Sequence, residues 1–142
     1  MYSLRPATAV DLDLCFDLHA AAMRSYVAAV WGWDDGVQRD FHARGFDPAR
    51  TRILTVDGRD LGVLIVEYRP DEIVLGRIEL HPDAQGRGIG TALIRGVLAE
   101  GAASGRPVTL EVLTVNPRAQ ALYERLGFRE VGRSGVKVRM RH

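Results

Sequence analysis

The sequence is short of several residue types, and each shortage excludes a class of protein. Its 142 residues include a single cysteine, Cys15, so no disulfide can form within the chain. Neither this cysteine nor the four histidines show the spacing of a metal site, and no metal is expected. A net charge of +1 gives no electrostatic reason to expect binding to nucleic acid or to a membrane. No apolar run approaches a membrane span and the N-terminus lacks a signal-peptide pattern, so a cytoplasmic protein is expected.

The residues that are present have the balance of an ordinary globular protein. Hydrophobic residues make up 46% and charged residues 26% of the chain, and this length is enough to bury one core. No linker, repeat or low-complexity stretch divides the sequence. We therefore expect a single domain over residues 1–142, with Cys15 as a buried and unreactive thiol.

Apolar periodicity predicts a mixed α+β domain. Helices are predicted over residues 12–30, 37–44 and 117–126. A further helical pattern includes Ile89, runs through residues 91–98 and is stopped by the glycine and proline of residues 104–107. Strands are predicted over residues 2–5, 51–56, 61–68, 73–80, 108–115, 128–133 and 136–140. Two opening helices, a run of strands and a β-α-β-α-β tail form the element order of an α+β fold.

The stretch from Arg77 to Gly90 carries the strongest functional signal. An apolar strand pattern is followed by a proline, and then by three glycines in five residues before a helical pattern begins. Such a turn leaves backbone N–H groups free at the positive end of a helix, which is a site for an anion such as phosphate. A P-loop would need Lys and Ser or Thr after the last glycine, and a dinucleotide fingerprint would need glycine where Thr91 stands. The simpler alternative is a tight connection that needs glycine only for its backbone angles.

This loop, with Gln85, Gly88 and Gly90, resembles the acyl-coenzyme-A loop of the GCN5-related N-acetyltransferase (GNAT) superfamily. A second matching motif runs from Asn116 to Phe128, with a spaced alanine and a Leu-Tyr-Glu run in the superfamily's order. The two motifs and the element order cover essentially the whole chain. The resemblance implies the GNAT fold, a central, mixed and mostly antiparallel sheet flanked by about four helices and splayed between its fourth and fifth strands. It also implies acetyl-coenzyme A as co-substrate and an amine as acceptor.

The resemblance also implies which residues bind the co-substrate. The set is Leu80, His81, Gln85, Gly86, Arg87, Gly88, Ile89, Gly90, Thr91, Asn116 and Ala119. Backbone amides from Gln85 to Thr91 would bind the pyrophosphate, and Arg87 would add a charged contact. The edge at Leu80 and its neighbours would pair with the pantetheine arm, and a backbone N–H there would polarise the thioester carbonyl.

Tyr123 and Glu111 are the predicted catalytic residues. Tyr123 would protonate the departing thiolate, and the alternative is an aromatic residue of the core. The place of Glu111 on the strand before Asn116 is similar to that of the base in ribosomal-protein alanine acetyltransferases. Its alternative is a charged residue on a solvated sheet face. Glu79 is the second candidate for the base, with His81 and Asp83 as weaker ones, and Val74 occupies the position where histone-type members carry a glutamate.

The acceptor is expected against the two opening helices and the loop between them, with Trp31, Trp33 and Asp34 as the predicted contacts. Aromatic faces beside carboxylates suit a cationic amine. The alternative is that the tryptophans seal the core and an aspartate caps a helix. The Trp-Gly-Trp-Asp stretch resembles a bacterial subgroup of acetyltransferases with no assigned substrate. His19, within the first helical pattern, is interpreted as a structural histidine.

The sequence therefore predicts an N-acetyltransferase that moves acetyl from coenzyme A to a primary amine by direct attack in a ternary complex. The acceptor is a small-molecule amine or a protein amine, and a protein Nα- or lysine acetyltransferase is the first alternative. A catalytically idle acyl-CoA-binding sensor is the second. A homodimer is possible through the final hairpin, where Val136, Val138 and Met140 share one face near a free sheet edge.

Overall fold

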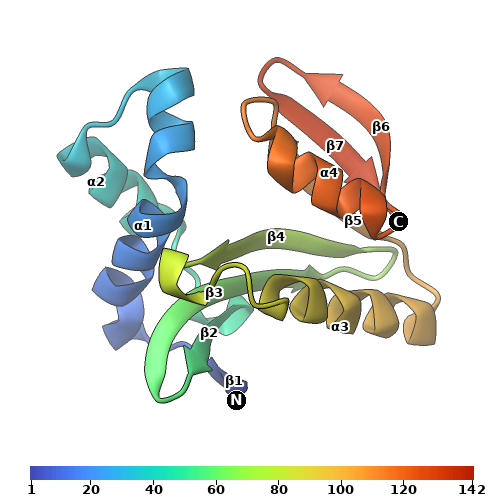
Figure 1. Cartoon of the computed structure of the whole chain (residues 1–142), viewed down its shortest axis with the longest axis horizontal. Coiled ribbons are helices and arrows are strands. Elements are labelled where there is room, and N and C mark those ends of the chain that lie inside the picture. The colour runs from blue at the N-terminus through green and yellow to red at the C-terminus, as the bar shows by residue number, and fades with distance from the viewer. The chain divides into compact units, whose positions relative to one another are not determined.

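The computed structural model describes every residue from 1 to 142 and confirms the predicted α+β class (Figure 1). The strands are β1 (Tyr2–Pro6), β2 (Thr51–Val56), β3 (Arg59–Tyr68), β4 (Ile73–Leu80), β5 (Val108–Leu113), β6 (Arg129–Ser134) and β7 (Lys137–Arg141). The helices are α1 (Leu12–Trp31), α2 (Asp35–Gly45), α3 (Ile89–Ser104) and α4 (Pro117–Arg125), with short 3-10 helices η1 (Ala9–Asp11), η2 (Pro48–Arg50) and η3 (Pro82–Ala84). The strands form one seven-stranded sheet in the order β1-β2-β3-β4-β5-β7-β6. No helix is both long enough and apolar enough to cross a membrane.

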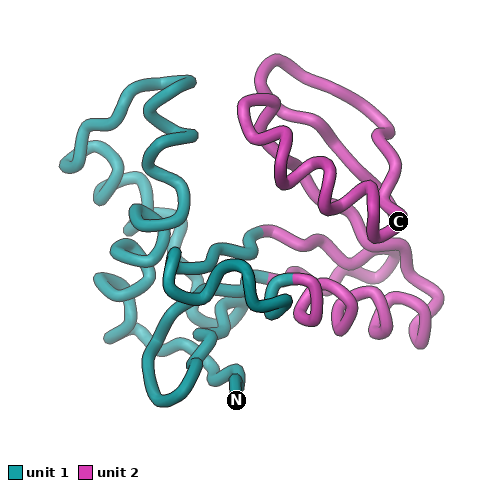
Figure 2. The backbone as a smooth tube through the Cα atoms, in the orientation of Figure 1, with its two compact units in different colours: residues 1–65, 77–90 teal, residues 66–76, 91–142 magenta.

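The chain divides into two compact units, which Figure 2 colours separately. Unit 1 consists of residues 1–65 and 77–90, and unit 2 consists of residues 66–76 and 91–142. Strands β3 and β4 each contribute residues to both units. The expectation of one domain over the whole chain stays a prediction.

Unit 1 is built on three antiparallel strands, β1, β2 and β3, and on helix α1. Its core contains a cluster of buried side chains from α1, from β2 and β3, and from the residue that follows β1, namely Ala7, Cys15, Leu18, Ile53 and Val63. Cys15 is a buried free thiol, as predicted, and burial raises its pKa to about 11. A thiol with a raised pKa carries little thiolate at neutral pH and is a poor nucleophile.

A charged network fixes the start of α1 in unit 1. The Arg5 guanidinium donates to both carboxylate oxygens of Asp11, each at 3.1 Å, and to Asp60 at 3.2 Å. The Asp11 carboxylate also accepts the backbone N–H of Thr8 at 2.9 Å, which is part of a capping box at the start of η1, just before α1. The hydrogen bonds from Arg5 hold the pKa of Asp11 below its ordinary value.

Unit 2 contains the pairing that makes the sheet mixed. β4 and β5 run parallel, and their ladder consists of two residue pairs at the start of the strands, Ile73 with Val108 and Val74 with Thr109. A ladder this short is what the predicted separation of these two strands requires. β5 pairs antiparallel with β7, and β7 with β6.

The final hairpin corrects one expectation about dimerisation. Val138 and Met140 of β7 have no exposed surface, so this apolar face belongs to the core. The edge strands of the sheet are β1 and β6, and the side chains of β6, the edge strand beside β7, are mostly exposed. An edge strand can still pair with another chain, so the homodimer stays a prediction without the apolar face that suggested it.

Candidate active site

The glycine-rich loop has the backbone shape of an anion site. Gly86 and Gly88 adopt φ angles of 75° and 74°, in the left-handed region that other residues enter only with strain. α3 begins directly afterwards at Ile89, whose side chain is buried and fixes the start of the helix. The backbone N–H groups of a first helical turn have no acceptor within the helix. The loop therefore presents donors together with the positive end of a helix dipole.

The end of β4 orients the backbone that the sequence assigns to the thioester. The N–H of His81 donates to the carbonyl of Leu61 on β3 at 2.8 Å. Because successive residues of a strand turn their N–H groups to opposite sides, the N–H of Leu80 points away from β3. The Leu80 carbonyl, on that same side, accepts the side-chain amide of Gln85 at 2.9 Å. Gln85 thus ties the loop to the strand end.

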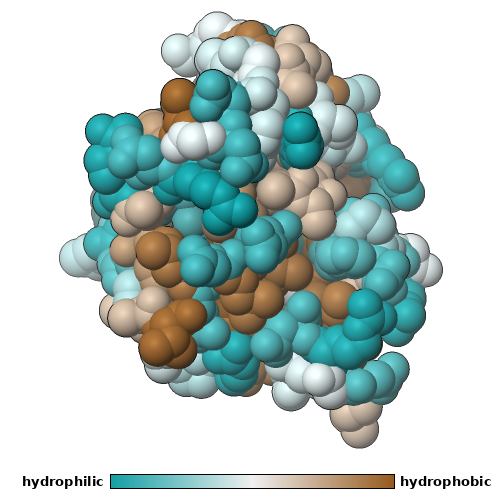
Figure 3. All heavy atoms as spheres, turned by 90° about the vertical axis from the view of Figure 1, so that its left-hand side faces the viewer, coloured by the Kyte–Doolittle hydropathy of each residue, from teal (hydrophilic) through white to brown (hydrophobic).

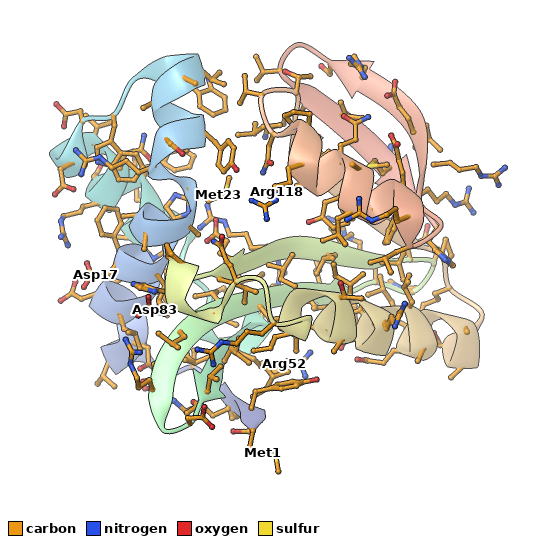
Figure 4. The ribbon with its side chains drawn as sticks, in the orientation of Figure 1. Met1, Asp17, Met23, Arg52, Asp83 and Arg118 are labelled. Carbon is orange, nitrogen blue, oxygen red and sulfur yellow. The ribbon has the colours of Figure 1, made fainter.

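His81 and Asp83 hold the turn between β4 and the loop. The ring Nδ1 of His81 accepts the backbone N–H of Asp83 at 3.0 Å, which caps η3. Asp83, labelled in Figure 4, accepts a hydrogen bond from Arg59 at 2.9 Å, and this contact lowers the pKa of its carboxyl. Both side chains already serve the turn, which weakens them further as candidates for the base.

A buried pair that the sequence did not connect lies in unit 1. Nδ1 of His19, on α1, lies 2.8 Å and 3.1 Å from the two carboxylate oxygens of Glu79, on β4. His19 is 8% exposed and Glu79 is 6% exposed. The two residues are 60 positions apart, so the only signal was that each polar residue stands in an apolar pattern.

Aromatic rings of α1 and the following segment pack around His19. Its ring centroid lies 6.2 Å from that of Trp33 and 6.0 Å from that of His42, and Phe16 also contacts both of these rings. Neither ring nitrogen of His42 makes a hydrogen bond, and burial lowers the pKa of this histidine. Trp33 is half-buried in this cluster, so it serves packing whatever else it does.

Trp31 and Asp34 were each predicted either to contact the acceptor or to serve a structural role, and the structure gives a different result for each. Trp31 is 59% exposed, so it does not seal the core. Val37 and Phe41 of α2 are also exposed, and Figure 3 shows apolar side chains reaching the surface between hydrophilic ones. The Asp34 carboxylate accepts the N–H of Val37 at 2.9 Å and caps α2, as its position predicts.

Unit 2 carries the remaining predicted residues. Glu111 is exposed on β5, opposite Arg139 of β7, so it lacks the apolar surroundings that its strand pattern suggested. Asn116 caps α4 by accepting the N–H of Ala119 at 3.2 Å. Its capping role is thus established by geometry, and its contact with the co-substrate stays a prediction.

Tyr123 lies on α4 and is half-buried. Its ring packs edge-on against Phe128 with centroids 5.7 Å apart, so part of the aromatic surface is used for packing. Its backbone carbonyl accepts the N–H of Phe128 at 3.0 Å, which closes the end of α4. The residue is therefore well fixed, as a proton donor has to be.

The sequence profile of the acetyltransferase (GNAT) family matches residues 14–128, which include the loop, the His19–Glu79 pair and Tyr123. This chain belongs to that family. The match covers most of both units, and it agrees with the resemblance that the two motifs carry.

Two of the comparisons concern enzymes named for ribosomal protein bS18. The ribosomal protein bS18-alanine N-acetyltransferase of Salmonella typhimurium is 40% identical over 78 residues, which are 54% of this chain and 53% of that protein. The chain thus spans about half the length of the curated relatives it matches. The structure of the ribosomal-protein-S18-alanine N-acetyltransferase from Escherichia coli covers 99% of this chain and 92% of its own, with 25% identity and a TM-score of 0.70.

A more distant GNAT structure shares the fold. The PaiA N-acetyltransferase from Thermoplasma acidophilum, solved in complex with coenzyme A, has a TM-score of 0.80 and 14% identity, over 99% of this chain and 98% of its own. The predicted GNAT fold is thereby confirmed.

Proposed function

We propose that this GNAT protein is an N-acetyltransferase that takes acetyl from acetyl-coenzyme A and passes it to a primary amine by direct attack. The observation that carries the proposal is the loop from Gln85 to Thr91, where two left-handed glycines lead into the positive end of α3. The family match and the coenzyme A held by the Thermoplasma relative support the same donor.

The residues divide the chemistry as follows. Amides of the loop bind the pyrophosphate, and the N–H of Leu80 polarises the thioester carbonyl. The amine nitrogen attacks the carbonyl carbon, a C–N bond forms, and the C–S bond breaks. The Tyr123 hydroxyl gives its proton to the departing thiolate and recovers one from solvent. Asn116 and Ala119, at the start of α4, contact the co-substrate arm.

The reaction also needs a base, because the attacking amine is an ammonium near neutral pH, and the carboxylates that the sequence offers are Glu111 and Glu79. Glu111 is exposed and faces the solvent side of β5, where it could act only through water. Glu79 is buried and already hydrogen-bonded to His19.

A protein N-terminus is the acceptor class that one observation favours over a free amine. The relative from Salmonella typhimurium carries a name for acetylation of a ribosomal-protein alanine, and a long local match links it to this chain. Trp31, exposed at the end of α1, and the neighbouring Trp33 and Asp34 are the proposed contacts for the acceptor.

The test is release of free thiol from acetyl-coenzyme A with N-terminal peptides, polyamines, amino acids and aminoglycosides as acceptors. We expect turnover with at least one acceptor class, and a loss of roughly 100-fold in kcat for Tyr123→Phe with coenzyme A affinity unchanged. Tyr68→Phe is the matched control, because its hydroxyl donates to Glu100 at the exposed surface of the same unit. Tight binding of coenzyme A without transfer to any acceptor would favour the sensor alternative instead.

A further inference from the structure

We infer that His19 is the base that takes the proton from the attacking amine, and that Glu79 is the positioning residue that holds its imidazole. The inference rests on the proposed function and deepens it, since it assigns one step of that reaction to a pair of residues within unit 1.

The geometry of the pair sets the direction of proton transfer. A carboxylate accepts only, so with Nδ1 at 2.8 Å from Glu79 Oε2 the imidazole carries its proton on Nδ1 and donates it. Nε2 is then left with a lone pair. Nε2 makes no hydrogen bond within the protein. It is also not enclosed by protein atoms, in contrast to the two ring nitrogens of His42. It therefore reaches the surface as an open proton acceptor.

The pair also lies beside the residues that the proposed reaction needs in unit 1. Glu79 directly precedes Leu80, whose N–H is assigned to the thioester carbonyl. His19 lies 6.2 Å, ring centre to ring centre, from Trp33, which is assigned to the acceptor. A base has to act where the acceptor amine meets the thioester carbonyl. His19 adjoins Trp33, the proposed acceptor contact, and its partner Glu79 adjoins Leu80, the proposed carbonyl contact.

A structural role alone explains less of what is observed. A buried pair of polar side chains contributes little net stability, and an apolar pair of similar size would fill the space as well. The neighbouring titratable groups are His42, stacked at 6.0 Å on His19, and Arg77, 3.9 Å from Glu79 Oε1. Neither of these occupies Nε2. Glu111, the base suggested by the sequence, has no such orienting partner and stands exposed opposite Arg139.

The proton balance closes without any further reactant. The ammonium of the acceptor gives one proton to Nε2 of His19, and the resulting imidazolium is stabilised by the Glu79 carboxylate. The neutral nitrogen attacks, the thioester C–S bond breaks, and the second N–H proton leaves the new amide nitrogen for solvent. Tyr123 protonates the thiolate and recovers its proton from solvent. His19 then releases its proton to solvent. The net reaction yields an acetamide, free thiol and one proton.

The experiment measures thiol release by the full-length protein across a pH range, with the best acceptor of the wild type. His19→Asn keeps an amide donor for Glu79 but removes the base, and Glu79→Gln keeps an acceptor for Nδ1 but removes the charge. We expect kcat at pH 7 to fall by about 100- to 1,000-fold in His19→Asn and by about 10-fold or more in Glu79→Gln. Both should keep the KM for acetyl-coenzyme A.

Two features separate a base from a structural residue. The deficit of His19→Asn should shrink towards pH 9 to 10, because an α-amine loses its proton to water above about pH 8. The control His42→Phe replaces the stacked neighbouring imidazole in the same cluster with a ring that does not titrate, and it should retain wild-type kcat at every pH.

The possible failures are distinguishable. If the wild type transfers acetyl to no amine, the proposed function falls and this inference falls with it. If the wild type is active and folded His19→Asn keeps its rate, or loses it equally at all pH values, only the assignment of His19 is overturned. Should His19→Asn fail to fold, Glu79→Gln decides, and wild-type kcat in that variant overturns the inference.

Discussion

His19 and His42 are both histidines on helices of unit 1, and the structure places them in opposite situations. His19 is satisfied by Glu79, whereas both ring nitrogens of His42 are buried without a hydrogen bond. An enclosed polar group without a partner costs about 1–3 kcal/mol. The ring of His42 nonetheless packs against Phe46 and Phe16, so its contribution to folding comes from the apolar surface of the ring.

We predict that His42→Phe stabilises the protein, and more so at lower pH. Burial lowers the pKa of His42 from its ordinary value of 6.5, and Arg77 and His19 add to the shift while Glu79 opposes it. Below pH 6.5 the unfolded chain therefore binds a proton at this histidine more readily than the folded chain does. The free energy of unfolding is at its full value above pH 6.5 and falls as the pH decreases below it. Urea unfolding at pH 7 and pH 5 should show a gain of about 1 kcal/mol or more that grows at pH 5. A gain that does not change with pH would contradict this explanation.

The connection between β4 and α3 shows how two elements make a site that neither has alone. β4 ends just before His81, which caps η3, and α3 begins directly after Gly86 and Gly88, both of which have left-handed φ angles. Gln85 links the parts by donating to the Leu80 carbonyl. The geometry of the loop therefore depends on backbone angles at Gly86 and Gly88 more than on any side chain.

We predict that Gly88→Ala weakens coenzyme A binding about 10-fold. A left-handed φ of 74° costs a residue with a Cβ roughly 1–2 kcal/mol. The loop relieves this strain by moving to another backbone conformation, which displaces the N–H groups that would bind the pyrophosphate. Gly96→Ala is the matched control, since Gly96 lies within α3 with open space around it, and alanine there should leave binding unchanged and add up to about 1 kcal/mol of stability. Isothermal titration calorimetry measures both affinities. If Gly88→Ala binds coenzyme A as tightly as Gly96→Ala does, the left-handed angle at Gly88 is not required for binding.

The whole chain is divided into two compact units, but the division cuts through strands. β3 and β4 each have residues in both units, so unfolding one unit also unfolds part of two strands that continue into the other. Backbone hydrogen bonds along those strands would be lost in both units at once. This sharing of strands is the physical reason to expect one cooperative domain over residues 1–142.

We predict a single thermal unfolding transition. Both tryptophans, Trp31 and Trp33, belong to unit 1, so fluorescence reports on that unit while far-ultraviolet circular dichroism reports on the whole chain. The two signals should give the same midpoint, as two-state unfolding requires. A fluorescence midpoint separated from the circular dichroism midpoint would show instead that the units unfold independently.

Local pattern was enough for the order of elements and for much of the loop. Apolar spacing predicted every long helix and strand to within a few residues, because these elements bury a face at a fixed period. Asp34 and Asn116 were recognised as caps because an N-cap acts only on its own first turn. The glycines of the loop were recognised for the same reason, since their role lies in their own backbone angles.

Contacts between distant residues were decided only by the tertiary structure. The sequence by itself determined the α+β class and the glycine-rich turn before α3. It could not show that His19 meets Glu79, that Glu111 is exposed, or that Val138 and Met140 belong to the core. The physical reason is that periodicity states which residues share a face of one element. It does not state which other element covers that face, and that packing determines whether a polar residue is paired, buried or left in water.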